Sequence, residues 1–69
     1  MSAIVLTNLG KQIAETSADR GPKFAVLSML YEADGPVEFE DIVDELNTDE
    51  EKASMIVRGL MNQGLVKEV

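Results

Sequence analysis

The sequence contains no cysteine and no histidine, and these absences exclude several kinds of chemistry. Without cysteine there can be neither a disulfide nor a thiol nucleophile, and without both residues the usual ligands of structural zinc are missing. Histidine is also the side chain that most often acts as a general base near neutral pH. The sequence therefore predicts no enzyme, no metal site and no other cofactor.

Aromatic residues and long apolar runs are scarce as well. The chain has two Phe, one Tyr and no Trp, although 45% of its 69 residues are hydrophobic, so Leu, Ile, Val, Met and Ala must form the core. No apolar run is long enough for a membrane span, and no basic segment with a long apolar stretch after it indicates a signal peptide. We expect one cytoplasmic domain over residues 1–69, and a homodimer because so short a chain buries a marginal core.

Basic residues are also few, since six Lys and Arg oppose thirteen Asp and Glu, giving a net charge of −7. Residues 1–35 carry four acids and three bases, a net charge of −1, whereas residues 36–69 carry nine acids and three bases, a net charge of −6. Lys and Arg supply most non-specific affinity for nucleic acid, so the acidic second half argues against DNA binding. The same charge also helps to keep a small protein soluble.

Hydrophobic periodicity and capping residues predict a mainly helical fold with a small sheet. The four expected helices lie near residues 8–18, 22–33, 39–46 and 49–63. Thr7 is placed to cap the first helix and Pro22 to open the second, while Gly35 suits the left-handed position that ends the second. Thr48 and Glu51 have the spacing of a capping box before the last helix.

The same periodicity predicts which side of each helix is buried. Leu9 and Ile13 share one side of the first helix, and Tyr31 belongs to an apolar set on the second. The third helix should bury Phe39, Ile42, Val43 and Leu46 and expose Glu40, Asp41, Asp44 and Glu45. The last helix should bury Ala53, Ile56, Val57, Leu60 and Met61 and leave Lys52, Ser54, Met55, Arg58 and Asn62 more exposed.

Two segments are candidates for strands. Residues 65–69 alternate apolar and charged side chains, which is typical of a strand. Residues 3–6, AIVL, are apolar with two β-branched members, which fits either a buried strand or the opening of a helix. Both alternatives stand at this point: a short strand over residues 3–6, or one continuous helix over residues 2–18.

Residues 35–66, GPVEFEDIVDELNTDEEKASMIVRGLMNQGLV, resemble the winged helix-turn-helix domain of transcriptional regulators. In that family Gly-Pro-Val precedes the first helix of the unit, Gly-Leu-Val closes the second, and a hairpin called the wing follows. Residues 4–15, IVLTNLGKQIAE, are similar to the return strand of the wing and the helix after it. The resemblance therefore implies a circularly permuted winged helix in which residues 3–6 pair antiparallel with residues 65–69.

The resemblance also implies a DNA-binding transcription regulator that places the helix of residues 49–63 in the major groove. The residues expected to contact double-stranded DNA are Lys52, Ser54, Met55 and Arg58, with Lys67 on the DNA backbone. Asp49, Glu50 and Glu51 count against this role because they would face phosphates. They also suit the positive end of the helix dipole, which needs no functional explanation.

The alternative is an acidic protein-interaction module or inhibitor that uses the same scaffold and binds no DNA. Glu40, Asp41, Asp44 and Glu45 would then dock a basic protein partner, unless that face is merely solvated. An exposed Met55 also suits a protein interface better than a DNA groove. The frequency with which this fold binds DNA favours the regulator narrowly. Gathering of the six bases on one face would support DNA binding, whereas their scatter would count against it. These bases are Lys11, Arg20, Lys23, Lys52, Arg58 and Lys67.

Overall fold

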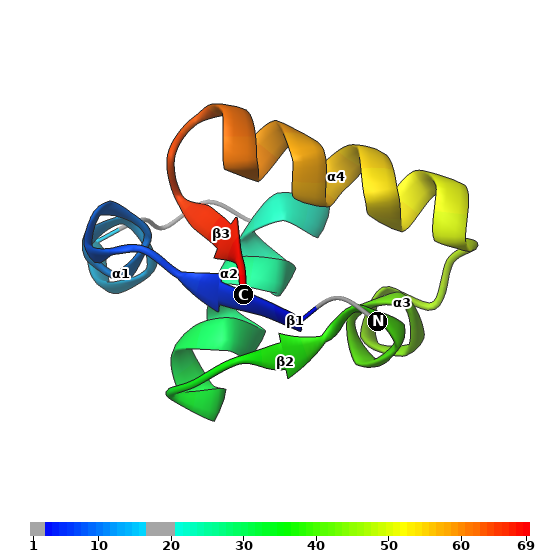
Figure 1. The fold of residues 1–69 in the computed structure, drawn as a ribbon, viewed down its shortest axis with the longest axis horizontal. Helices are drawn as coiled ribbons and strands as arrows, with labels where there is room; N and C mark the ends of the chain where they lie inside the picture. Colours follow the sequence, from blue (N-terminus) through cyan, green and yellow to red (C-terminus); the bar gives the residue numbers. More distant parts are fainter. Residues whose placement is uncertain (1–2, 17–20) are drawn as a thin grey trace.

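The structure, a computed structural model, describes residues 3–16 and 21–69, which form four helices and a three-stranded sheet (Figure 1). The elements are β1 (Ala3–Leu6), α1 (Asn8–Thr16), α2 (Pro22–Ala33), β2 (Val37–Glu38), α3 (Phe39–Leu46), α4 (Glu50–Asn62) and β3 (Val66–Glu68). The predicted mainly helical fold is confirmed. The bounds of α2 and α3 agree with the prediction, α4 is shorter by one residue at each end, and the expected last turn of the first helix, at residues 17 and 18, lies outside the described residues.

β1 is the central strand of the sheet, which has the order β2-β1-β3 and is antiparallel throughout (Figure 1). The register places Leu6 opposite Val66, and the Val69 backbone N–H donates to the Ala3 carbonyl at 2.9 Å. Pairing of residues 3–6 with the end of the chain is therefore confirmed. The alternative of one helix over residues 2–18 is wrong, because residues 3–6 are a strand with partners on both sides.

Thr7 joins β1 to α1 and fixes both to the chain that follows α4. Its side-chain oxygen accepts from the Gly10 N–H at 3.1 Å, as predicted for the N-cap, and its hydroxyl donates to the Gly64 carbonyl. The Thr7 N–H also donates to the Leu65 carbonyl at 3.0 Å. Thr7 thus accepts a hydrogen bond from a free backbone N–H at the start of α1, and it also joins two segments that lie far apart in the sequence.

The core lies between the sheet and the helices. Its largest fully buried side chains are Ile4, Leu30, Ile42, Leu60 and Val26. Along β1 the buried residues alternate with half-buried ones, so one face of the sheet packs on the helices and the other remains open. The predicted apolar sides of α3 and α4 face inward, but only Ile42, Ala53, Val57 and Leu60 are buried, whereas Phe39, Val43, Leu46, Ile56 and Met61 are half-buried. Two apolar expectations are wrong: Leu9 is 47% exposed, because α1 buries its Gly10 side instead, and Tyr31 is 42% exposed.

Two predicted helix ends are also corrected. The left-handed residue after α2 is Asp34, with φ 52°, not Gly35. Gly35 precedes a proline, which favours extended backbone at that position. The cap of α4 is Asp49, whose carboxylate accepts from the Lys52 N–H at 2.8 Å, so the predicted capping box is wrong. A carboxylate accepts the capping hydrogen bond as well as a hydroxyl does, and its negative charge is also attracted to the positive end of the helix dipole.

Candidate nucleic-acid interface

The α3–turn–α4 unit presents one side of α4 to solvent. Ile42 is the buried residue of α3, and Asn47, with φ 53°, ends that helix in the left-handed conformation. Asp49 then starts α4, which buries the side of Ala53 and Val57. This helix-turn-helix arrangement follows from local signals: an apolar stripe on each helix, a residue that tolerates positive φ, and a capping carboxylate.

Three of the predicted contact residues share the outward side of α4. Lys52, Met55 and Arg58 are all exposed, and Met55 has 68% of its surface accessible. Their helical spacing places Met55 between the two bases, opposite the buried stripe. From Lys52 to Lys67 the sequence contains no carboxylate. This side of α4 is therefore an uncovered surface with two positive charges around a central apolar side chain.

Ser54 is half-buried, less exposed than expected, and lies with Arg58 on one flank of α4. Both line a hollow of about 290 Å³ between α4 and the sheet, with Ile4, Phe39 and Glu68 among its other walls. The carboxylate of Glu68 thus shares this hollow with the Arg58 guanidinium. A phosphate that reaches Arg58 would meet that negative charge as well.

Lys67 does not join the other predicted residues. Val66 is buried, and Glu68 lines the hollow on the helix side of the sheet. Successive side chains of a strand point to opposite faces, so Lys67 lies on the open face of the sheet, cross-strand from Val5. The structure therefore separates Lys67 from Arg58 by the thickness of the sheet.

Lys23 is a neighbour of α4 that sequence reasoning missed. A Cβ built on Gly59 would lie 3.4 Å from Lys23 Cε and 3.5 Å from Nζ, so the ammonium rests against the α4 backbone. No local signal could have found this contact, because 36 positions separate the two residues and only the packing of α2 on α4 brings them together. Of the five described bases, Lys23, Lys52 and Arg58 lie on or beside α4, whereas Lys11 and Lys67 lie elsewhere. The described bases therefore do not all gather on one face, which counts against DNA binding, and Arg20 lies outside the described residues.

Most acidic residues of the α3–turn–α4 unit lie on α3 and at the start of α4. Glu40, Asp41, Asp44 and Glu45 are all exposed on α3, and Glu50 and Glu51 occupy the first turn of α4. Asp49 caps that helix, so part of this charge has a structural role. The carboxylates make the start of α4 unfavourable for phosphate and leave its later turns as the more favourable part.

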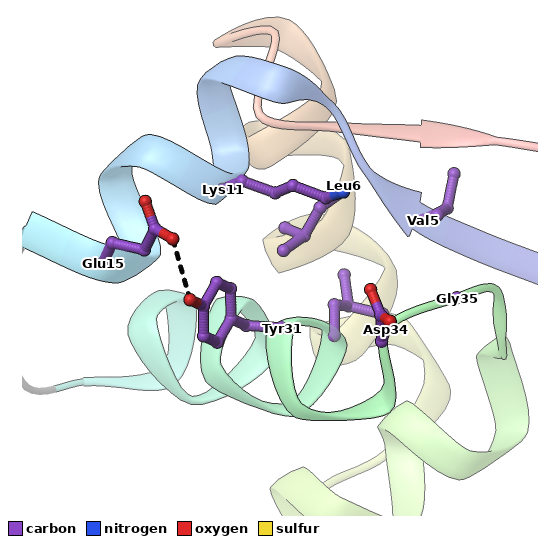
Figure 2. A pocket seen from close by; sticks show the side chains of 8 residues that line it. Val5, Leu6, Lys11, Glu15, Tyr31, Asp34 and Gly35 are labelled. Atoms are coloured by element: carbon purple, nitrogen blue, oxygen red, sulfur yellow. Dashed lines mark hydrogen bonds between the residues drawn. The ribbon is translucent and has the colours of Figure 1, made fainter.

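A second charged site lies between β1, α1 and the end of α2, as Figure 2 shows. The hollow has a volume of about 420 Å³ and is walled by Lys11, Glu15, Tyr31 and Asp34. The Tyr31 hydroxyl donates to a Glu15 carboxylate oxygen at 2.8 Å, which ties α2 to α1. This hydrogen bond raises the pKa of Tyr31 above its ordinary value of 10.0, helped by the negative charges of Glu15 and Asp34.

We expect the tyrosinate absorbance of Tyr31 to titrate above pH 10, and it is unambiguous because the chain has one tyrosine. Glu15→Gln should lower that midpoint toward the ordinary value, since the charge and the strongest acceptor are lost. Glu32→Gln is the control and should leave the midpoint unchanged. The pKa of Tyr31 is higher in the folded chain than in the unfolded chain. The stability that this hydrogen bond adds is therefore fully present at pH values below the unfolded-state pKa, and it is lost as the pH rises through the folded-state pKa. A titration midpoint at the ordinary pKa of tyrosine in the unaltered protein would contradict the hydrogen bond between Tyr31 and Glu15.

Within residues 3–16 and 21–69, no cluster of three or more carboxylates has the geometry to hold a metal ion. In the same part of the chain, no helix is long and apolar enough to cross a membrane.

Comparisons with protein-family models, with curated proteins and with solved structures find no match for this chain. Any function proposed for the chain therefore depends on the positions and charges of its own residues.

Proposed function

We propose that this chain is a small DNA-binding regulator that contacts duplex DNA with the outward side of α4. One observation carries the proposal: from Lys52 to its end at Asn62, α4 contains no Asp or Glu, and Lys52, Arg58 and the neighbouring Lys23 lie on or beside its outward side. An α-helix is narrow enough to enter the major groove, where arginine can donate two hydrogen bonds to guanine. On this proposal Arg58 reads a base or phosphate, and the two lysines position the backbone.

The pairing of β1 with β3 also supports a permuted winged helix. The helix that reads DNA in that family is followed by a strand whose antiparallel neighbour leads into a further helix. Here β3 follows α4, β1 pairs with it, and α1 follows β1 (Figure 1). Fold alone does not fix function, so the proposal depends on the charges of α4 rather than on this topology.

The test is the binding of fluorescent duplex DNA, followed by anisotropy at about 50 and 200 mM salt. With two or three bases on phosphates, we expect the logarithm of the association constant to fall with a slope of about −2 to −3 against the logarithm of salt concentration. Arg58→Ala should weaken binding about tenfold at low salt and make the slope shallower by about 1.

Lys11→Ala is the matched control, because it removes the same charge at the hollow of Figure 2, away from α4. Its binding should stay within about twofold of the unaltered protein. Equal losses in the two variants would mean that only net charge matters and that α4 has no special role. No binding at tens of micromolar protein in low salt would overturn the proposal.

A second candidate is an interaction module for a basic protein, for which the exposed carboxylates of α3 and the 68% exposed Met55 are the specific support. This module would retain its partner after Arg58→Ala but lose it when Glu40, Asp41, Asp44 and Glu45 are replaced by their amides. The DNA proposal expects the reverse for duplex binding, so the two sets of variants separate the candidates.

A further inference from the structure

A hollow at the meeting point of α1, α2 and α4 has a chemistry unlike the rest of the surface. Its volume is about 550 Å³, within the usual range of small-molecule clefts. The apolar walls are Ile13, Phe24, Leu27, Ile56, Leu60 and Leu65. Leu27, Leu60 and Leu65 are buried and form the floor, whereas Ile13, Phe24 and Ile56 are half-buried. An apolar body can therefore leave water here without displacing the core.

The charge of the hollow is positive, although the chain carries thirteen acids and six bases. Among the described residues that line it, Lys23 is the one charged residue, and none is Asp or Glu. Three other hollows of the described chain each include a carboxylate: Glu15 and Asp34 in the first, Glu68 in the second, and Glu32 and Glu45 in the third. An anion that enters this hollow would therefore meet a positive charge with no carboxylate among the described walls.

The start of α2 adds to this preference. The cap residue Gly21 offers no side chain to the first turn of α2, which also contains no acidic residue. Within residues 21–33 no acidic side chain of the first turn offsets the positive end of the helix dipole, and Gly21 and Pro22 both line the hollow beside Lys23. The Lys23 ammonium lies at the α4 side, next to Gly59. An anionic group entering between α2 and α4 would meet both positive features together.

We propose that this hollow binds a small amphipathic carboxylate, with its apolar body on Phe24, Leu27 and Leu60 and its carboxylate at Lys23. Gln63, also on the wall, is placed to donate a hydrogen bond to the bound molecule. The site does not depend on DNA binding. It does connect to the candidate interface, because Lys23 belongs to both, so an occupied hollow would draw that ammonium away from phosphate.

The experiment uses 2-naphthoate as the probe and 2-naphthalenemethanol as its uncharged counterpart, in the intact chain. The absence of Trp leaves the naphthalene fluorescence undisturbed. We expect saturable binding of the carboxylate with a Kd on the order of 100 µM, about fivefold tighter than the alcohol at low salt. In ¹⁵N-labelled protein, the shifts caused by the carboxylate should concentrate at Ile13, Phe24 and Gln63.

Two variants on the wall of the hollow test the charge, and both replace exposed residues so that folding is preserved. Lys23→Met keeps the apolar stem and should reduce carboxylate affinity to that of the alcohol. Gln63→Glu replaces the hydrogen-bond donor with a carboxylate of the same size and should weaken binding of 2-naphthoate about fivefold more than binding of the alcohol. Lys11→Met, which removes a positive charge from a different hollow, should alter neither affinity.

The proposal is overturned if the alcohol binds as tightly as the carboxylate, or if Lys23→Met and Lys11→Met weaken binding equally. It also fails if the shifts spread over the surface or if binding does not saturate at millimolar probe. None of these outcomes depends on DNA affinity, so this site and the proposed DNA function can fail separately.

Discussion

Replacing Gly10 with alanine is expected to destabilise the protein by about 2–4 kcal/mol, although alanine is the better helix former. A Cβ at Gly10 would overlap the Leu65 carbonyl oxygen and lie 2.9 Å from the Leu65 carbonyl carbon and 3.0 Å from Leu6 Cδ2. Two of these atoms are backbone and cannot turn aside. Relief would require α1 to move away from the chain leading into β3.

The cost of that movement is specific, because Thr7 ties α1 to this segment. The Thr7 N–H donates to the Leu65 carbonyl, and the Thr7 hydroxyl donates to the Gly64 carbonyl. Moving α1 outward would stretch both bonds and the β1–β3 pairing next to them. We expect the midpoint of urea unfolding, followed by circular dichroism, to fall accordingly.

Gly59→Ala is the matched control, since it makes the same substitution inside a helix. A Cβ there meets the Lys23 side chain at 3.4 Å, and the end of a lysine can move away. The variant should therefore gain up to about 1 kcal/mol from helix propensity. If Gly10→Ala were as stable as Gly59→Ala, the close approach of α1 to Leu65 would be contradicted.

Ile42→Ala should destabilise the protein by about 2–5 kcal/mol. Ile42 is fully buried and is the buried residue of α3, whose other apolar side chains are only partly covered. Removing it leaves a cavity where α3 meets the core and releases the first helix of the helix-turn-helix unit. Calorimetry should show a melting temperature lower by many degrees in this small domain.

Met55→Ala is the comparison for an apolar side chain outside the core. Because Met55 is 68% exposed, its truncation should change the free energy of unfolding by less than about 0.5 kcal/mol. A large loss would contradict the exposure of Met55 in solution. Such a loss, if it varied with protein concentration, would indicate that a second copy covers this side of α4, as the expected homodimer allows.

The same arrangement that favours DNA contact also limits it. Arg58 shares its hollow with Glu68, and the first turn of α4 carries Glu50 and Glu51. We therefore expect modest affinity with a shallow dependence on salt rather than the steep dependence of a strongly basic protein. If α4 contacts DNA, this charge pattern favours Lys52 and Arg58 over the capping end of the helix, which is a narrower prediction than the fold alone would make.

The sequence by itself determined the elements of this protein. The apolar stripes of α3 and α4, Pro22 at the start of α2 and Thr7 before α1 are local signals, and each produced the expected element because its partners lie within one or two turns. The strand at residues 3–6 was also predicted from the sequence, as one of two alternatives. The sequence could not decide which of two adjacent residues caps a helix. Asp34 and Gly35 are both suited to end α2, and Thr48 and Asp49 are both suited to cap α4, with little difference in intrinsic free energy.

The tertiary structure alone decided which distant residues meet. It placed Lys23 against Gly59, put Lys67 on the other face of the sheet from Arg58, and turned α1 so that Gly10 rather than Leu9 is buried. These outcomes depend on how whole helices pack on a sheet of only three short strands, and packing is fixed by the shape of the complete core rather than by any one segment. The elements could therefore be predicted from the sequence, whereas the surfaces proposed to carry the function could not.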